Sequence, residues 1–476
     1  MKVKSVLVPG KFQVIHSGHI RLFRMAKQLG ERTIIALDHQ GLSKDEILWR
    51  KRALLGLNLI DQIEVFDTDI SELVLRLKPK IILKGMEFST QDNAEVSILN
   101  SYGGKLMFSS GPVYYSESDL ILENPIQSNL KFDVNRYGNE FFVRNKIGKD
   151  KLLNSLQLLK KIRTCVIGDL IVDEIINCHP IGMSQEDPSI AVTPIDSKKF
   201  IGGAGIVAGH CSSLGSKTTF VTVLGQDSTS DWAIKQLRSM VDDIRIIRDD
   251  SRATNLKQRF KSGKQNLLKL NHFTENSISK STENKILKFF EANVSQFDLL
   301  ILSDFSFGVI SNLLAQRLIH IAQKAKIFVA SDSQTSSQLG NLSKFKGSDL
   351  ITPTELEARL EIRDTNCGLV VLAENLMKLM ETKNILLKLG PDGVLLHGSS
   401  RDNEVVGTDQ VPALNKNAID VSGAGDSMLA ASALLLSSGE NLYVATYLAS
   451  IVAAVQVSRL GNVPVSIEEI QSVLNL

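Results

Sequence analysis

One short stretch, residues 419–427, constrains this chain more than any other. Its centre reads Gly423-Ala424-Gly425-Asp426, and an Ala/Leu-rich run starts at Met428. Glycines let a backbone turn and approach a ligand closely, and the N-terminus of a helix presents unpaired amides and a positive dipole. The stretch therefore predicts a loop that opens onto a helix and binds phosphate through Gly423, Ala424 and Gly425.

Asp426 would lie among these amides. A carboxylate there suits a general base that takes the proton of a hydroxyl group as this group attacks a phosphorus atom. The same four residues could instead form a plain capping loop with an acid in the first helical turn. The motif alone leaves both interpretations open.

A second glycine-rich stretch, Gly202-Gly203-Ala204-Gly205, lies far upstream. Together the two stretches resemble the signatures of the ribokinase-like sugar kinases of the phosphofructokinase-B type. The resemblance implies a doubly wound α/β kinase domain over residues 156–476, with Gly202 and Gly203 beside the sugar. It also implies that Asp173 binds sugar hydroxyls, although a strand-end Asp can equally satisfy backbone amides. Ile206 departs from the family, which has a sugar-binding asparagine there.

Other segments of this part extend the resemblance. Lys388, Gly390 and Gly393 match a nucleotide-binding strand and turn, and Glu357 matches the family acid linked to magnesium and phosphate. Thr354 stands where the family usually has an asparagine.

Two segments, residues 252–260 and 265–270, predict antiparallel strands, on which Lys257 and Arg259 alternate onto one face. They resemble a segment of the heptose-phosphate kinases, which implies that both residues hold a phosphate already on the substrate. A solvated strand face is the alternative.

The N-terminal part opens with a short apolar strand, followed by two histidines that flank a glycine, His16-Ser17-Gly18-His19. A helical pattern follows. Two imidazoles beside a helix N-terminus can donate to phosphate oxygens and stabilise charge on an attacked α-phosphate. A satisfied pair of surface histidines is the alternative.

This pattern resembles the nucleotidylyltransferase superfamily, which includes cytidylyltransferases and sugar-phosphate adenylyltransferases. Strands expected at 33–37, 63–66 and 81–83, with helices between them, predict a parallel, Rossmann-like sheet in residues 1–125. The resemblance implies a substrate contact from Arg50 and nucleotide or phosphate contacts from Gly10, Phe12, Gly18, Lys84, Gly85, Ser116 and Ser118. Plain capping is the alternative for the two serines, and Glu117 replaces a small hydroxyl residue between them.

Composition excludes some classes. The net charge of +2 gives no general electrostatic case for binding nucleic acid or membranes. Four scattered cysteines argue against a zinc site or disulfides and favour a reducing cytoplasm. The apolar region 428–457 is broken at 437–441, which predicts two buried helices rather than a membrane span.

Residues 126–155 are assigned to a linker between two doubly wound parallel-sheet domains. Across nearly the whole chain, the resemblance is to the bifunctional heptose-phosphate kinase/adenylyltransferase, with the two halves in reverse order. It implies phosphorylation of a sugar or sugar phosphate by ATP, nucleotidyl transfer from ATP or CTP, Mg²⁺ in each half, and a homodimer. Because Ile206, Thr354 and Glu117 depart from the families, an enzyme with one active half is an alternative. A sensor without turnover is another alternative, against which the intact His16, His19 and Asp426 argue.

Overall fold

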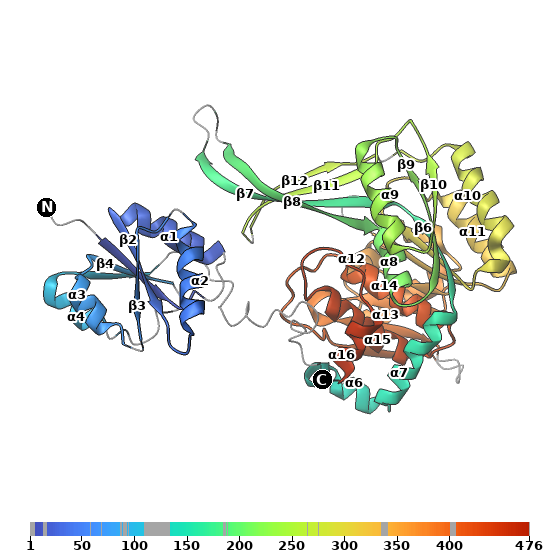
Figure 1. The fold of residues 1–476 in the computed structure, drawn as a ribbon. Coiled ribbons are helices and arrows are strands. Elements are labelled where there is room, and N and C mark those ends of the chain that lie inside the picture. Colours follow the sequence, from blue (N-terminus) through green and yellow to red (C-terminus); the bar gives the residue numbers. More distant parts are fainter. Residues whose placement is uncertain are drawn as a thin grey trace. The chain divides into compact units, whose positions relative to one another are not determined.

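The computed structural model describes residues 5–12, 17–57, 59–67, 69–85, 88, 93, 95–108, 134–183, 187, 189–263, 265–274, 276–334, 341–399 and 406–475. The chain divides into two compact units, Met1–Asn129 and Leu130–Leu476, and each unit has a hydrophobic core of its own (Figure 1).

The first unit contains a parallel five-stranded sheet in the order β3-β2-β1-β4-β5. The strands are β1 (Ser5–Gly10), β2 (Arg32–Asp38), β3 (Gln62–Phe66), β4 (Ile81–Lys84) and β5 (Lys105–Phe108). One face packs on α1 (Ser17–Leu29) and α2 (Lys44–Leu55), and the other packs on α3 (Ser71–Leu77) and α4 (Glu95–Tyr102). The strand order reverses between β1 and β4, so the crevice at their carboxyl ends is the expected ligand site.

The second unit is built on a nine-stranded sheet in the order β10-β9-β6-β13-β14-β15-β16-β17-β18. Its pairs are parallel from β10 to β16 and antiparallel from β16 to β18. The strands are β6 (Arg163–Gly168), β9 (Lys217–Leu224), β10 (Asp243–Arg248), β13 (Leu299–Asp304), β14 (Phe328–Ser333), β15 (Leu350–Ile351), β16 (Asn384–Lys388), β17 (Val394–Ser399) and β18 (Val406–Val411).

Helices cover both faces of this sheet, as near-continuous apolar strands require. One core cluster joins the sheet to α7 (Lys149–Leu158), α8 (Ala204–Ser213), α9 (Ser228–Met240), α14 (Ala424–Ser437), α15 (Leu442–Gln456) and α16 (Ile467–Asn475). The other cluster contains α10 (Lys280–Asn293), α11 (Asn312–Lys324), α12 (Glu355–Ile362) and α13 (Leu369–Met380). In α6 (Val134–Arg144), Phe141 stacks on Tyr447 of α15.

The prediction of two buried helices after Met428 is confirmed by α14 and α15, which are apolar almost all round. No helix within the described ranges combines the length and the apolar character that crossing a membrane would demand.

A separate four-stranded sheet, in the order β12-β11-β7-β8, projects from this core (Figure 1). Its strands are β7 (Leu170–Met183), β8 (Ile190–Gly203), β11 (Asn255–Ser262) and β12 (Gln265–His272). The predicted antiparallel pair is confirmed by β11 and β12. Strand β11 also runs parallel to β7, and this register places Lys257 opposite Asp173.

Asp169 is the one residue between β6 of the large sheet and β7 of the small sheet. Its carboxylate accepts hydrogen bonds from the backbone amides of Phe305, Phe307 and Val309 at 2.9, 3.4 and 3.1 Å. Burial and the nearby Asp304 raise the pKa of Asp169 to about 6. The junction of the two sheets is therefore fixed to the loop that follows β13.

Gly168, just before this junction, packs directly on the neighbouring strand. A Cβ atom there would lie 1.9 Å from the Ser303 carbonyl oxygen, a backbone atom that cannot move aside. Gly168→Ala should lower the free energy of unfolding by at least about 2 kcal/mol, as overpacking does. Urea unfolding measures it.

Gly148→Ala is the matched control, because a Cβ atom there meets nothing within 4 Å. Its cost should stay within about 1 kcal/mol, the loss expected at an N-cap position. Equal losses in the two variants would contradict the tight contact between β6 and β13.

Candidate active sites

A cavity of about 1170 Å³ in the second unit lies between the small sheet and the carboxyl end of the large sheet. The structure brings to it most of the residues predicted for the kinase half: Asp173, Gly203, Lys257, Arg259, Glu357, Lys388, Gly390, Gly393, Gly423, Ala424, Gly425 and Asp426. Gly202 lies just behind this lining, since a Cβ atom there would lie 2.4 Å from Asp173 Oδ2.

The glycine loop at the start of α14 has the geometry that its sequence predicts. Gly423 is the N-cap and adopts a left-handed φ of 77°, which a residue with a side chain rarely does. At Gly425, a Cβ atom would come within 3.2 Å of Lys388 Nζ. The glycines thus let the helix N-terminus face the cavity with a lysine close to its first turn.

Asp426 lies in that first turn, buried but at the wall of the cavity. Its Oδ1 accepts a hydrogen bond from Gln334 Nε2 at 3.0 Å. Burial first, and then the charge of Asp332, raise the pKa of Asp426 to about 7, although Lys388 works in the opposite direction. A carboxylate with such a pKa is matched to proton transfer at neutral pH.

Lys388 at the end of β16 is paired with Asp332 of β14, with 2.8 Å between Nζ and Oδ2. Burial disfavours the charge of Lys388, but Asp332 and Glu357 outweigh it and raise the pKa of Lys388. Burial raises the pKa of Asp332 to about 6 despite the lysine. The pair places one cation beside three acids, Asp332, Glu357 and Asp426.

Asp173 lies on β7 and lines the same cavity. Its Oδ1 accepts from Arg259 Nη2 at 3.3 Å, and its Oδ2 accepts from Asn462 Nδ2 at 3.4 Å. Burial raises the pKa of Asp173, against the effect of Arg259 and Lys257. Burial likewise lowers the pKa of Lys257. Arg259 and Lys257, the predicted pair of cations, therefore both lie beside the predicted sugar-binding carboxylate of Asp173.

Glu357 takes part in a capping box at the start of α12. Its carboxylate accepts from the Thr354 amide at 2.7 Å, while the Glu357 amide donates to Thr354 Oγ1 at 3.3 Å. Thr354 therefore caps the helix, which explains how a threonine serves this position. The capping box holds the carboxylate of Glu357 at the cavity wall.

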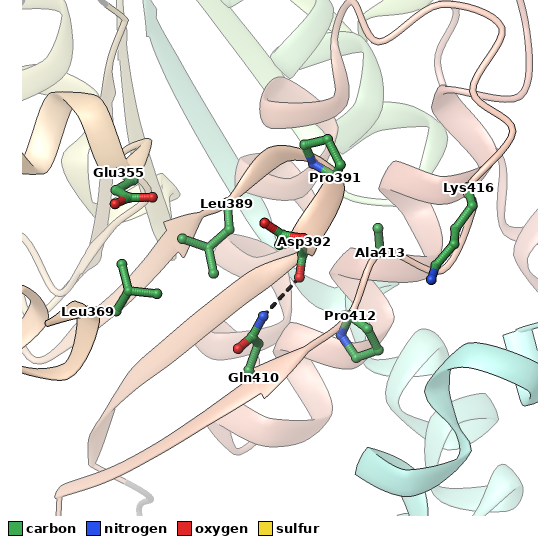
Figure 2. A pocket seen from close by; sticks show the side chains of 9 residues that line it. All are labelled: Glu355, Leu369, Leu389, Pro391, Asp392, Gln410, Pro412, Ala413 and Lys416. Carbon is green, nitrogen blue, oxygen red and sulfur yellow. Dashed lines mark hydrogen bonds between the residues drawn. The ribbon is translucent and has the colours of Figure 1, made fainter.

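The lining of the cavity also includes apolar residues, which suit a flat organic group such as a nucleobase: Pro412, Ala413, Leu414, Ala453 and Ala454. A smaller cavity of about 370 Å³ adjoins it and shares Pro391, Asp392, Pro412, Ala413 and Lys416 (Figure 2). In Figure 2, Gln410 Nε2 donates to the Asp392 carbonyl at 2.9 Å. This bond ties β18 to the turn that contains Gly390 and Gly393.

Sequence reasoning missed three polar residues of this site, Gln334, Asp332 and Asn462. Asp332 lies near the end of β14 and Gln334 directly follows this strand, and polar residues at the end of a buried strand, at a sheet's carboxyl edge, were an available signal. Asn462 lies in the segment 457–466 between α15 and α16, and its local sequence carries no such signal.

In the first unit, Gly10 ends β1, and Phe12 lies in the loop that follows. Phe12 is buried with a positive φ of 46°, and its ring lies so close to Gly10 that a Cβ atom there would be 2.8 Å away. The ring of His19 on α1 packs edge-on against Phe12, 5.0 Å between centroids, and stacks on Phe23. Phe12 thus supports His19, and Gly10 makes room for Phe12.

Lys84 ends β4, next to the same crevice. Its Nζ donates to Asn93 Oδ1 and to Glu95 Oε1, each at 2.8 Å. Arg50 on α2 donates to the Lys11 carbonyl at 2.8 Å, so it lies near the loop after β1. Gly85 is buried, and Gly18 lies in the first turn of α1. The predicted residues His16, Ser116 and Ser118 lie outside the described residues.

The two folds are of known types. The second unit resembles the ribokinase of Thermotoga maritima with a TM-score of 0.53 and 23% identity, covering 66% of this chain and 100% of that chain. Phosphofructokinase-2 of Escherichia coli is equally similar, with a TM-score of 0.53 and 17% identity over 66% and 98%. The predicted α/β fold class is confirmed.

The large, mostly parallel sheet is partly covered by the small sheet, and the cavity between them contains a helix N-terminus with the buried Asp426. This arrangement is the ribokinase-like fold. The chain belongs to the pfkB family of carbohydrate kinases, whose model matches residues 161–469. A cytidylyltransferase-like model matches residues 7–87.

Curated relatives confirm the resemblance that the motifs indicated. "Bifunctional protein HldE" of Sulfurimonas denitrificans is 31% identical over 328 residues, which is 66% of this chain and 65% of that protein. The protein of the same name from Helicobacter acinonychis is 29% identical over 65% of this chain and 66% of that protein. The match thus spans about two thirds of either relative.

The raised pKa of Asp426 generates a prediction for pH dependence. Under the prediction that Asp426 is the general base, which acts only when deprotonated, a pKa of about 7 means that kcat/KM of the kinase should fall about tenfold per pH unit below about 7. Gln334→Leu removes a hydrogen bond that stabilises the charged carboxylate, which raises its pKa. The acidic limb of the pH profile of kcat/KM should therefore shift to higher pH. ADP release measured between pH 5.5 and 9 checks both. A limb that stays in place in the variant would contradict this role of Gln334.

Proposed function

We propose that this chain is a bifunctional enzyme that makes a nucleotide-activated sugar of the ADP-heptose type. The second unit phosphorylates a sugar or sugar phosphate with ATP, and the first unit transfers a nucleotidyl group to the resulting phosphate. The observation that carries this proposal is Asp426, a buried carboxylate with a pKa of about 7 at the start of α14, in one cavity with Asp173, Lys257 and Arg259.

In the kinase step, Asp173 accepts hydrogen bonds from sugar hydroxyls and holds one hydroxyl near Asp426. Asp426 takes the proton of this hydroxyl while the hydroxyl oxygen of the sugar bonds to the γ-phosphorus of ATP. The bond between that phosphorus and the leaving ADP then breaks. The amides at the start of α14 stabilise the charge on the transferred group.

The charges around Asp173 favour a sugar that already carries a phosphate. Arg259 and Lys257 place two positive charges beside Asp173 at the cavity wall, where Asp420 and Asp426 are also close enough to interact. In a largely buried site these two cationic groups attract an anionic group more strongly than in water. A guanidinium and an ammonium are the side chains that bind phosphate best.

Mg²⁺ is the metal that this site suits, because its acids Glu357, Asp332 and Asp426 offer hard oxygen donors. Within the described part of the chain, no cluster of three or more acids, histidines or cysteines forms a metal cage. That agrees with a cation held by one carboxylate, for which we propose Glu357, together with nucleotide phosphates. Bound there, Mg²⁺ would neutralise triphosphate charge.

In the first unit, we assign to His16 and His19 the stabilisation of the attacked α-phosphate. An oxygen of the sugar phosphate bonds to the α-phosphorus of ATP or CTP, and pyrophosphate leaves. His19 supports this assignment through its packing on Phe12, at the carboxyl ends of β1 and β4. We further propose that the chain works as a homodimer in the cytoplasm; light scattering after gel filtration tests the dimer.

One observation favours a second candidate, a kinase whose transferase half is inactive. The side chains of Lys84 and Glu95 are only 13% and 10% exposed, and they form an ion pair of 2.8 Å. A lysine held in this way is less available to a triphosphate than a free one would be.

A panel of nucleotides and sugars on the purified protein separates the two candidates. ADP release and pyrophosphate release are followed in separate assays, with heptose 7-phosphate among the substrates. Both signals, with pyrophosphate release dependent on the kinase product, are expected of the bifunctional enzyme. ADP release alone would establish the second candidate.

Single substitutions should separate the two halves. Asp426→Asn should lower ADP release roughly 10²–10⁴-fold, because the base is lost. Its pyrophosphate release should stay normal when a sugar 1-phosphate is supplied. His19→Ala should lower pyrophosphate release roughly 10²–10³-fold and leave ADP release unchanged. Loss of both signals in either variant would contradict two independent sites.

A further inference from the structure

The turn between α15 and α16 contributes one residue that contacts both the predicted sugar-binding carboxylate and the predicted phosphate loop. Asn462 is buried and lines this cavity. Its Nδ2 donates to Asp173 Oδ2 at 3.4 Å. Its Oδ1 lies against Gly423, where a Cβ atom would be 2.4 Å away. A single amide group therefore spans from the predicted sugar-binding carboxylate to the first glycine of the phosphate loop.

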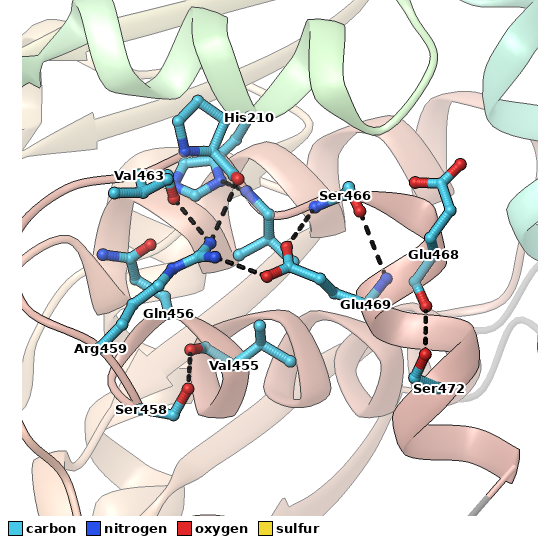
Figure 3. A network of polar contacts seen from close by, with 12 residues as sticks. His210, Val455, Gln456, Ser458, Arg459, Val463, Ser466, Glu468, Glu469 and Ser472 are labelled. Carbon is cyan, nitrogen blue, oxygen red and sulfur yellow. Dashed lines mark hydrogen bonds and ion pairs between the residues drawn. The ribbon is translucent and has the colours of Figure 1, made fainter. Parts of the chain in front are cut away.

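Residues close to Asn462 in the sequence take part in a network of ion pairs and hydrogen bonds around Arg459 and Glu469 (Figure 3). Arg459 forms an ion pair of 2.6 Å with Glu469 and donates to the carbonyls of Val463 and Pro464. The Val465 amide donates to Nδ1 of the buried His210 at 3.1 Å. The turn is thus tied to α16 and to α8.

The turn is also tied to the loop that precedes α14. The Gly461 amide donates to Asp420 Oδ2 at 3.1 Å, and the Gly461 carbonyl accepts from Gln456 Nε2 at 2.9 Å. Gln456 Nε2 also donates to the Ser422 carbonyl at 3.2 Å. Asn462 therefore stands on backbone that is fixed relative to the phosphate loop.

The two carboxylate oxygens of Asp173 accept hydrogen bonds from different parts of the structure. Oδ1 faces Arg259 of the small sheet, whereas Oδ2 faces Asn462 of the helical layer. Ile206, on α8, is fully buried and apolar and offers no hydrogen bond. Asn462 is thus a direct polar link between Asp173 and the helical layer. Arg259, which also donates to Ser422 Oγ at 3.0 Å, provides a second, indirect link to the loop before α14.

We propose that Asn462 is a positioning residue of the kinase, which fixes the Asp173 carboxylate relative to the phosphate loop so that a bound sugar hydroxyl is directed at the transferred phosphate. This inference rests on the proposed kinase function. It assigns to Asn462 the discrimination of the sugar, because the hydroxyl that Asp173 can accept depends on how its carboxylate is oriented.

The test measures ADP release with ATP and heptose 7-phosphate, varying each substrate in turn. Asn462→Ala and Asn462→Leu should raise the KM for heptose 7-phosphate roughly tenfold to a hundredfold, as loss of a hydrogen bond to a charged group does. The KM for ATP should change less than about twofold. Asn293→Ala is the control, since Asn293 caps the end of α10 by donating to Phe289.

Asn462→Asp adds a readout that loss of folding cannot imitate. Two facing carboxylates share a proton when the pH falls, so the ratio of variant to wild-type KM for heptose 7-phosphate should decline from pH 8 to pH 6. The ratio corrects for the other charged groups that face Asp173, namely Arg259, Lys257, Asp420 and Asp426.

The outcomes are distinct. A wild-type protein that releases no ADP overturns the proposed kinase function before any variant is made. A wild-type protein that turns over, with a sugar KM that Asn462→Ala leaves within twofold, overturns the role of Asn462 alone. Equal rises of both KM values in Asn462→Ala and Asn462→Leu also overturn it, because they indicate general damage.

Discussion

Charges buried at one edge of a sheet are the constraint on which the rest of the second unit depends. A buried charge is costly unless it is paired and hydrogen-bonded. Asp332 has Lys388, and Asp173 has Arg259 and Asn462. Asp426 has one neutral donor, Gln334, besides its helix. The pKa of Asp426 rises to about 7, further than those of Asp169 and Asp332, and we propose Asp426 as the base.

Features encoded within a few adjacent residues could be predicted from the sequence. Gly423 caps α14, and Ala424 to Asp426 form its first turn, as their sequence predicts. Glycine conformations and helix caps are local properties of the chain. The alternation that puts Lys257 and Arg259 on one face is likewise local. The position of Lys257 and Arg259 beside Asp173 is not a local property, because it follows from the pairing of two strands that are distant in the sequence. Asn462 reaches the site only through tertiary packing.

The first unit shows a different limit of sequence reasoning. The resemblance implied that Lys84 contacts nucleotide or phosphate, and Lys84 does end β4 beside the expected ligand crevice. Its ammonium group is nevertheless paired with Glu95, the first residue of α4. The motif locates a residue on the backbone, but competition among side chains decides what that residue binds. His16, Ser116 and Ser118 lie outside the described residues, and their roles stay predictions.

The small sheet and the large sheet hold different parts of the kinase site, joined at Asp169. Asp173, Lys257 and Arg259 belong to strands of the small sheet, whereas Lys388, Glu357 and Asp426 belong to the large sheet and its helices. Under the proposed function, most contacts to the acceptor and the groups for phosphoryl transfer are encoded on separate surfaces, which Asn462 connects. Substitutions in β7 and β11 would then alter the acceptor while the start of α14 stays unchanged.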